Sequence, residues 1–258
     1  MWGALSAPSL AELRAVAQPE SLLARRGEEH WAGRLYMRRL SIRLTRLLAP
    51  TSVTPNALTA LMIPAGLFAA LLVSFSSVWL ALGAVLLIQI QLLLDCADGE
   101  LARWRQTVSP RGVYLDQIAH YSTEAALPAA LGVRADGGWD SIGGWTALGL
   151  AVSVLILMLK AETHLLQLAR FRAGRTAVEA PAEVARRRSW LRQGTRLLPY
   201  FRPFHAVEAS FLAFAAAVVD ALADDLVGSR ILVGALAVTA VVAVAGHLTA
   251  VLASDRLR

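Results

Sequence analysis

Six long apolar segments constrain the fold of this chain more than any other feature of its sequence. They cover approximately residues 56–74, 77–94, 112–133, 144–168, 204–223 and 231–253. An α-helix needs roughly 20 apolar residues to cross the hydrocarbon core of a bilayer, and each segment comes close to that length. A helix also satisfies its own backbone hydrogen bonds, as hydrocarbon requires. The pattern therefore predicts an all-α integral membrane protein with six transmembrane helices.

The third and fourth segments are less purely apolar than the others. Their ionisable residues are Asp116, His120, Glu124, Lys160, Glu162 and His164. Charge within a membrane segment is costly and often marks a functional position, although a lysine can also reach the membrane surface by snorkelling. The sixth segment holds only His247 as an ionisable group. Such a segment argues against the alternative, which is a set of buried helices in a large soluble protein.

The basic residues predict how the chain crosses the membrane. Eight precede the first segment, three lie between the second and third, nine lie between the fourth and fifth, and two follow the sixth. The opposite connections hold only Arg134 and Arg230. Because positive charge collects on the cytoplasmic side, we expect a multi-pass protein of the cell membrane with both termini and residues 95–111 in the cytoplasm. The net charge of +6 then reflects contact with anionic lipid, and we expect no nucleic-acid partner.

Residues 1–50 contain no spanning segment, so we divide the chain into an N-terminal segment, 1–50, and a membrane domain, 51–258. Between His30 and Leu48, apolar residues alternate with five arginines in a helical pattern. This pattern is typical of an amphipathic helix that lies in the headgroup plane. The alternative is that some of these arginines, namely Arg38, Arg39 or Arg43, also contact an anionic substrate. The Arg-rich connection 169–202 has the same two explanations, lipid contact or a site for an acceptor phosphate or a donor headgroup.

The chemically most distinctive stretch joins the second and third segments and reads DCADGELARWRQTVSPRGVYLDQIAH, residues 95–120. Helical periodicity places Asp95 and Asp98 on one helix face, and Asp116 and His120 on a face of the next helix. If the two helices pack antiparallel, these side chains converge. Converging carboxylates at the edge of hydrocarbon need a cation, and a divalent metal ion is the obvious candidate.

At this point the sequence resembles the CDP-alcohol phosphotransferase, or CDP-alcohol phosphatidyltransferase, family. The family signature is Asp-x-x-Asp-Gly-x-x-Ala-Arg, then eight residues, then Gly-x-x-x-Asp-x-x-x-Asp. Every fixed position is matched between Asp95 and Asp116, and only the last differs, because His120 stands where an Asp is expected. The Thr-Pro-Asn at 54–56 and the six segments extend the resemblance over roughly residues 34–258.

The resemblance implies a transferase of phospholipid biosynthesis that moves a phosphoryl-alcohol group from a CDP-linked donor to an acceptor hydroxyl and releases CMP. It implies that Mg²⁺ or Mn²⁺ binds to residues at the signature's acidic positions, namely Asp95, Asp98, Asp116 and His120. It implies nucleotide contacts from the residues that leave the helix face open or carry polar groups, namely Gly99, Ala102, Arg103, Gly112 and Asn56. CDP-diacylglycerol is the expected donor, a homodimer the expected assembly, and the acceptor alcohol stays open.

His120 leaves three alternatives. In the first, the protein is an active transferase in which His120 is the general base or a metal ligand, since an unperturbed imidazole pKa of roughly 6.5 suits proton transfer near neutral pH. Glu124, one helical turn further, would then orient the ring. In the second, another group such as Glu124 is the base, with Asp116 still in the site. In the third, the protein binds nucleotide or lipid without turnover. A membrane transporter is a further alternative, but the polar residues gather at one end of the segments rather than along a path.

Overall fold

The computed structural model describes residues 8–19, 31–174 and 202–253 of the 258-residue chain. These residues are almost entirely helical, and no strand occurs among them, so the predicted all-α class is confirmed. The helices form two compact units. One contains the described residues up to Val73 together with Val78–Thr123, and the other contains Ser74–Ser77 and the described residues from Glu124 onward. Most of the Arg-rich connection lies outside the described residues.

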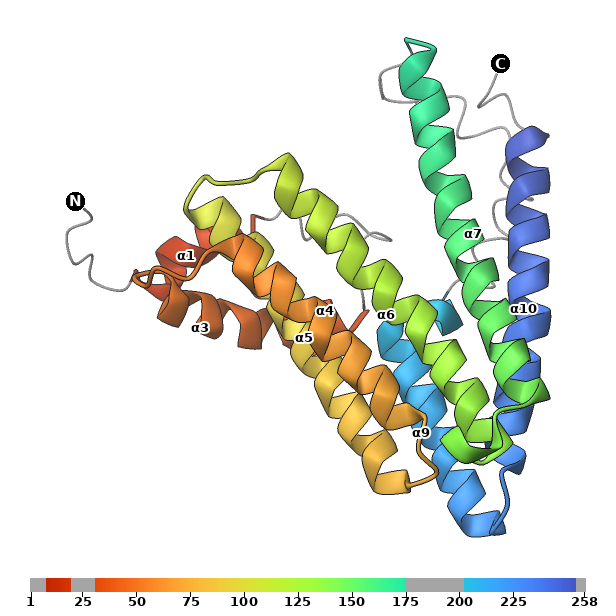
Figure 1. The fold of residues 1–258 in the computed structure, drawn as a ribbon. Coiled ribbons are helices and arrows are strands. Elements are labelled where there is room, and N and C mark those ends of the chain that lie inside the picture. Colours follow the sequence, from red (N-terminus) through yellow and green to blue (C-terminus); the bar gives the residue numbers. More distant parts are fainter. Residues whose placement is uncertain (1–7, 20–30, 175–201, 254–258) are drawn as a thin grey trace. The chain divides into compact units, whose positions relative to one another are not determined.

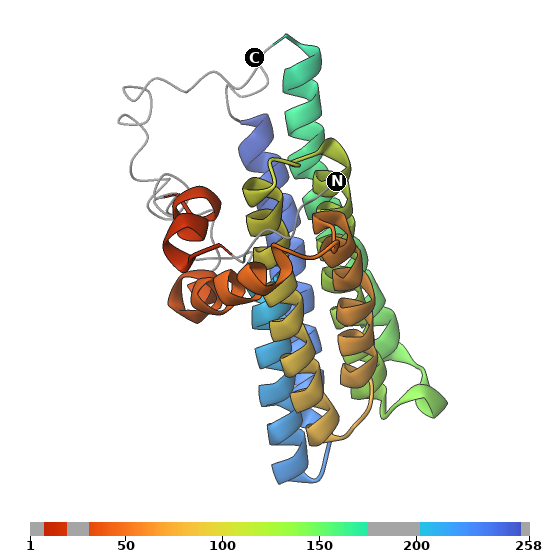
Figure 2. The same cartoon turned by 90° about the vertical axis from the view of Figure 1, so that its left-hand side faces the viewer.

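The first unit combines two short helices with a pair of long ones. Its elements are α1 (Leu10–Ala17), the π-helical turn η1 (Gly33–Met37), α3 (Arg38–Leu48), α4 (Pro55–Val73), α5 (Val78–Trp104) and the start of α6 (Pro110–Asp136). Helices α4 and α5 lie side by side, and α1 and α3 pack across α5 (Figure 1, Figure 2). Buried Leu13, Ala17 and Ile42 form a small core there, and Trp104 packs against it.

Helix α1 is short but well terminated. The Ser9 hydroxyl accepts a hydrogen bond from the Glu12 backbone N–H at 3.2 Å, and the Glu12 carboxylate accepts one from the Ser9 backbone N–H at 3.0 Å. This reciprocal arrangement is a capping box, which satisfies two backbone donors at the start of a helix. Hydrogen bonds from the Ser9 side chain and backbone lower the pKa of Glu12 below its ordinary value. The start of α1 is also tied to α3, because the Arg46 Nε donates to the Pro8 carbonyl at 2.9 Å.

The helix predicted between His30 and Leu48 forms from Trp31 to Leu48 and is π-helical over η1. It buries one face, which carries Met37 and Ile42, against the unit. Its other face leaves the apolar residues Leu35, Leu40 and Leu47 exposed. An exposed apolar face flanked by arginines is typical of a helix at a lipid surface. Its place in the headgroup plane stays a prediction.

A buried amide joins three helices in the first unit. The Gln91 Nε2 on α5 donates to the Met62 carbonyl of α4 at 3.1 Å and to the Thr123 hydroxyl of α6 at 2.8 Å. A Cβ on Gly66 of α4 would collide with Thr123, so only glycine permits this approach. Small residues and interhelical hydrogen bonds are the usual means by which helices associate in lipid.

The second unit contains α7, the longest helix among the described residues. Its elements are the end of α6, the short 3₁₀ helix η2 (Trp139–Ser141), α7 (Gly144–Arg172), the 3₁₀ turn η3 (Arg202–Phe204), α9 (Ala206–Ala223) and α10 (Val227–Leu252). Glycines allow α6 and α7 to touch, because a Cβ on Gly132 would lie 2.5 Å from the Trp145 carbonyl oxygen and 3.2 Å from the Cα of Gly149. The Ser153 hydroxyl of α7 also donates to the Ala125 carbonyl at 2.6 Å.

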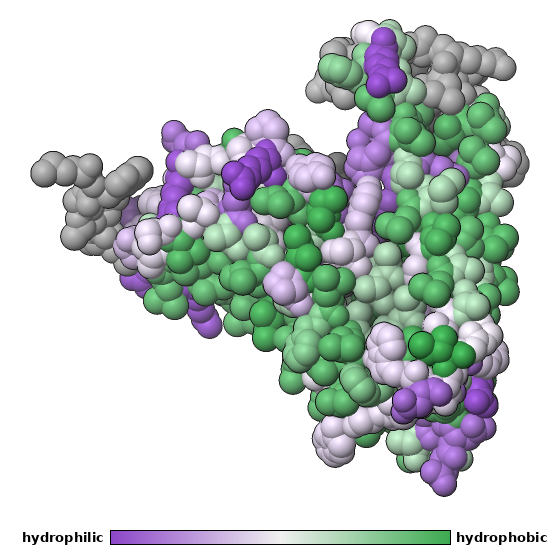
Figure 3. Space-filling view, in the orientation of Figure 1, coloured by the Kyte–Doolittle hydropathy of each residue, from purple (hydrophilic) through white to green (hydrophobic). Residues whose placement is uncertain are grey.

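Five helices, α4, α5, α7, α9 and α10, are long and apolar enough to cross a membrane. They correspond to five of the six predicted segments. The remaining segment forms α6, which has the length of a span but is interrupted by Asp116, His120 and Glu124. Large apolar side chains stay exposed along the spans, including Phe68, Trp79, Leu86, Val154 and Val238. Hydrophobic side chains dominate the visible sides of these helices, as lipid contact requires (Figure 3). The chain is therefore a multi-pass membrane protein.

A fully buried arginine holds one end of the second unit together. The Arg134 Nε lies 3.2 Å from the Asp220 carboxylate of α9 and 3.0 Å from the Ser229 hydroxyl of α10. Its two Nη groups donate to the carbonyls of Phe75 and Ser76, at 2.5 and 3.0 Å. The sequence places Arg134 in a connection, but it is buried in the last turn of α6. Every charge in this cluster is paired.

Replacing Arg134 by alanine should destabilise the protein strongly, because Asp220 would be buried without a counter-charge. Breaking a buried ion pair in this way costs about 3–5 kcal/mol, so we expect a large fall in the thermal unfolding temperature in detergent. Arg230→Ala is the matched control, since that side chain is 39% exposed and pairs with the exposed Asp225 at 3.4 Å. Equal losses for the two variants would contradict a special role for the buried cluster.

Candidate metal and nucleotide site

The site forms where α5 ends and α6 begins. Helix α5 continues to Trp104, well past Leu94 where the predicted apolar segment ends, so the acidic stretch is helical. Ser109 precedes α6, and its hydroxyl accepts a hydrogen bond from the Gly112 backbone N–H at 3.2 Å. Serine before a proline in the first helical position is a typical start of a helix. The turn predicted around these residues therefore returns the chain beside α5.

Asp95, Asp116 and His120 converge in the first unit. The His120 Nε2 lies 3.3 Å from an Asp116 oxygen and 3.6 Å from an Asp95 oxygen. One ligand atom from each of the three residues lies within 4.8 Å of the other two. The three side chains are about one third exposed, at 29–34%, so the cluster is open to a ligand. The structure thus brings together three of the four residues expected to bind metal.

The fourth expected ligand, Asp98, has a different neighbour. Its carboxylate accepts a hydrogen bond from the hydroxyl of Thr59 on α4, and its side chain is almost completely buried. Asp98 lies three residues, or one helical turn, after Asp95 on α5, so it borders the cluster without belonging to its innermost group. No sequence motif points to Thr59. Its place four residues after Pro55, on the face that α4 turns to α5, could have indicated this role.

Three of the residues expected to contact nucleotide lie on one part of α5. Gly99 and Ala102 leave the helix surface there open, and the Arg103 side chain lies over part of it. Gly99 carries no side chain, and the Arg103 guanidinium lies beside it: a Cβ on Gly99 would be 3.1 Å from the Arg103 Nη1. Ala102 follows on the same helix and is partly exposed. The Arg103 Nε donates to the Ala17 carbonyl of α1 at 2.7 Å. The direction of this guanidinium is therefore set by the N-terminal helix.

Gly112 and Asn56, the two remaining residues expected to contact nucleotide, lie next to each other. A Cβ on Gly112 of α6 would lie 3.0 Å from the Asn56 side-chain oxygen of α4, which is closer than most side chains tolerate. Glycine therefore allows the Asn56 amide to sit directly against the first turn of α6. The structure places both residues beside the start of α6, which leads to Asp116.

Glu124 does not have the partner that the sequence predicts. It belongs to the second unit, where its carboxylate is buried and lies 2.6 Å from the Lys160 Nζ of α7 and 3.5 Å from the His205 Nδ1 at the start of α9. The described contacts of His120 are instead to Asp95 and Asp116. A buried carboxylate needs a nearby positive charge, and Lys160 supplies it for Glu124. The expectation that Glu124 orients His120 is not met in this structure.

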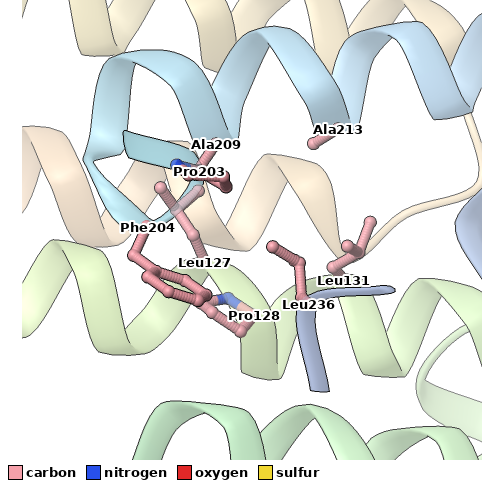
Figure 4. Close-up of a pocket in the computed structure, with 8 residues that line it drawn as sticks. All are labelled: Leu127, Pro128, Leu131, Pro203, Phe204, Ala209, Ala213 and Leu236. Carbon is pink, nitrogen blue, oxygen red and sulfur yellow. The ribbon is translucent and has the colours of Figure 1, made fainter. Parts of the chain in front are cut away.

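An apolar pocket lies next to these residues within the second unit. It is lined by Leu127, Pro128, Leu131, Pro203, Phe204, Ala209, Ala213 and Leu236 (Figure 4). Leu127 follows Glu124 by one helical turn, and Phe204 directly precedes His205. The residues that line the pocket include no charged side chain.

The carboxylate cluster fits a divalent cation. Asp95 and Asp116 supply hard oxygen ligands, which Mg²⁺ and Mn²⁺ prefer, and the His120 imidazole is a nitrogen ligand that Mn²⁺ accepts more readily than Mg²⁺. The spacing of the three ligand atoms allows one ion to contact all of them after small side-chain movements. These chain residues define a candidate metal centre at the end of a bundle of membrane helices.

Comparisons with known proteins identify the family of this chain. A model of the CDP-alcohol phosphatidyltransferase family matches residues 52–239, well over half of the chain. The chain therefore belongs to the CDP-alcohol phosphatidyltransferase family, and the resemblance inferred from the signature is confirmed. It is also similar to the bifunctional IPC transferase and DIPP synthase of Aquifex aeolicus (strain VF5), with 35% identity over 119 residues. That match covers 46% of this chain and only 26% of the relative's length.

Replacing Thr59 by valine should weaken metal binding if Asp98 contributes to it as the signature predicts. Valine keeps the shape of threonine but cannot donate a hydrogen bond to the Asp98 carboxylate. Residues that orient metal ligands typically change affinity 10–100-fold, so we expect the dissociation constant for Mn²⁺ to rise about tenfold in a spin-resonance titration. Thr249→Val is the control, because among the described residues that hydroxyl bonds to the Ala245 carbonyl of its own helix alone, at 2.7 Å. Unchanged affinity in Thr59→Val would contradict the prediction.

Proposed function

We propose that this protein transfers a phosphoryl-alcohol group from a CDP-linked donor to an acceptor hydroxyl and releases CMP. The observation that carries the proposal is the convergence of Asp95, Asp116 and His120 inside the family signature. Membership of the CDP-alcohol phosphatidyltransferase family supports the same reaction. A transporter would need polar groups along a path through the bilayer, whereas this cluster lies where α5 and α6 meet at one end.

The reaction requires one P–O bond to form and another to break. The acceptor oxygen attacks the phosphorus that carries the donor's alcohol, the bond from that phosphorus to the CMP phosphate breaks, and CMP leaves with the bonding electrons. A bound divalent cation supplies neutralisation of the charge on the pyrophosphate and on the departing CMP. In this assignment Asp95, Asp98 and Asp116 hold the cation. Arg103 and Asn56 bind the nucleotide, with Gly99, Ala102 and Gly112 leaving room for it.

His120 then has two possible roles, and they use different nitrogen atoms. As a ligand, it binds through the Nε2, which already lies among the carboxylate oxygens. As a general base, His120 keeps its Nε2–H in a hydrogen bond to Asp116 or Asp95. The unprotonated Nδ1 then accepts the proton of the acceptor hydroxyl. Carboxylates fix histidine tautomers in this way in metal sites and in catalytic triads. Glu124 is less suited to act as the base, because Lys160 and His205 occupy its carboxylate.

The choice of substrates and the setting of the reaction are also part of the proposal. We place the site on the cytoplasmic side of the cell membrane, where the arginines of the sequence gather and where a soluble nucleotide product is released. The donor is CDP-diacylglycerol, with a soluble CDP-alcohol as the alternative that an assay distinguishes. Glycerol phosphate, inositol phosphate, a second lipid or another polyol are the acceptors to test. The assembly is a homodimer that serves phospholipid biosynthesis.

The first test measures CMP release by the purified protein from CDP-linked donors with each candidate acceptor and Mg²⁺ or Mn²⁺. We expect the wild type to be active and Asp98→Asn to lose both CMP release and Mn²⁺ binding, because an amide cannot replace the anionic ligand. Metal removal by a chelator should stop the wild type, and added Mn²⁺ should restore it. Retained Mn²⁺ binding in Asp98→Asn would remove Asp98 from the metal site. A wild type inert over the whole donor panel would favour a binding protein without turnover.

The second test separates the two roles of His120. If His120 is the general base, His120→Ala should lower kcat by about 10²–10⁴-fold while Mn²⁺ affinity changes little. If it is a ligand, Mn²⁺ affinity should fall together with kcat. His120→Asp restores the signature of the family and should retain more activity than His120→Ala in either case. His120→Ala with full activity and full Mn²⁺ affinity would exclude both roles.

A further inference from the structure

Glu100 is a buried carboxylate that the proposed reaction does not use. It lies on α5 between Asp98 and Arg103, and its side chain is completely shielded from solvent. Its donors are Gln18 Nε2 at 2.7 Å, Ser41 Oγ at 2.6 Å, Thr45 Oγ1 at 2.8 Å and Arg38 Nη1 at 3.4 Å. A carboxylate that is fully buried depends on such donors. All of them come from the N-terminal helices, so Glu100 fastens α1 and α3 to α5.

Gln18 is the most informative of these donors because of its position. It is the first residue after α1, and its Nε2 also donates to the Arg38 backbone carbonyl at 2.9 Å. Its side-chain amide therefore links the end of α1 to both α3 and α5. Buried Leu13 and Ala17 hold the same helix against Ile42, so the end of α1 has a defined place.

Ala17 and Gln18 contact α5 at two points one helical turn apart. The Ala17 carbonyl accepts from the Arg103 Nε, while the Gln18 amide donates to Glu100. Glu100 and Arg103 are three residues apart and so lie on neighbouring positions of one helix face. The hydrogen bond to Ala17 uses the Nε of the guanidinium. It leaves Nη1 and Nη2, which lie beside Gly99, for oxygen atoms of an anionic ligand.

We propose that Gln18 and Glu100 are positioning residues that act through Arg103. They fix the end of α1 and so hold the Ala17 carbonyl in place. This carbonyl accepts from the Arg103 Nε and thereby orients the guanidinium beside Gly99 on α5. This inference rests on the proposed function, in which Arg103 contacts the nucleotide of a CDP-linked donor. The N-terminal segment is then part of the nucleotide site.

A role in stability alone would give a different pattern of effects. Loss of a hydrogen bond that merely holds α1 lowers stability and leaves the affinity of the folded protein for nucleotide unchanged. Loss of a hydrogen bond that positions Arg103 lowers nucleotide affinity when Arg103 is present. It has no further effect on affinity once Arg103 has been replaced. Double-mutant cycles measure such dependence, because residues that act through one another are not additive.

The experiment measures the dissociation constant of CMP by calorimetry, with the full-length protein in detergent and Mn²⁺ present. The variants are Gln18→Ala, Arg103→Ala, their combination and the control Arg46→Ala. Arg46 ties the opposite end of α1, at Pro8, and touches neither Glu100 nor Arg103 in the described contacts. Gln18→Met, which keeps the length of the side chain but cannot donate, replaces Gln18→Ala if that variant does not fold.

We expect Gln18→Ala to raise the dissociation constant about five- to tenfold, the scale of one ordinary hydrogen bond. Arg103→Ala should raise it at least as much, and the double variant should match Arg103→Ala within about twofold, as non-additive residues do. Arg46→Ala should leave it unchanged. Unchanged affinity in Gln18→Ala, or additive effects in the double variant, would overturn the inference while the proposed function stands. Unchanged affinity in Arg103→Ala would instead remove Arg103 from the proposed nucleotide site, and the inference with it.

Discussion

The cost of placing carboxylates near hydrocarbon governs the first unit of this protein. Asp95 and Asp116 lie against His120, Asp98 accepts from Thr59, and Glu100 is surrounded by donors. The contacts of Asp95, Asp98 and Glu100 join α5 to α6, to α4 and to the N-terminal helices, respectively. Helix α5 is therefore held by the partners of its own acidic residues. A buried carboxylate is costly unless it has hydrogen-bond donors or a counter-charge. Because other elements supply these partners, the same residues hold the elements of the site together.

Much of this arrangement follows from the sequence, and the reasons differ from case to case. Segment lengths and apolar runs predicted the long helices, and helical periodicity placed Asp95 and Asp116 on faces that could meet. The partners of Glu100, Asp98 and Glu124 could not be predicted in the same way. They come from residues far along the chain, so tertiary packing decides them and local pattern does not.

His120 changes the electrostatics of the family's acidic cluster. An aspartate there would add a fourth negative charge and would depend on a cation for its neutralisation. An imidazole brings its own N–H, so Asp95 and Asp116 gain a hydrogen-bond donor within the chain. The substitution therefore gives the protein a way to order the cluster before any ligand arrives. A chain that has made this exchange needs less positive charge from a bound ion.

The buried Arg134 also has a consequence for how the chain is assembled. The carbonyls it satisfies belong to Phe75 and Ser76, in the connection between α4 and α5, while its counter-charge comes from Asp220 near the end of α9. Ribosomes deliver these parts in order, so the connection leaves the ribosome long before its partners exist. Those carbonyls must therefore stay hydrated until α6 supplies Arg134, and Arg134 lacks its counter-charge until α9 has been made. The cluster can therefore be completed only after both α9 and α10 have been made, and a chain that ends before α9 leaves Arg134 without its counter-charge.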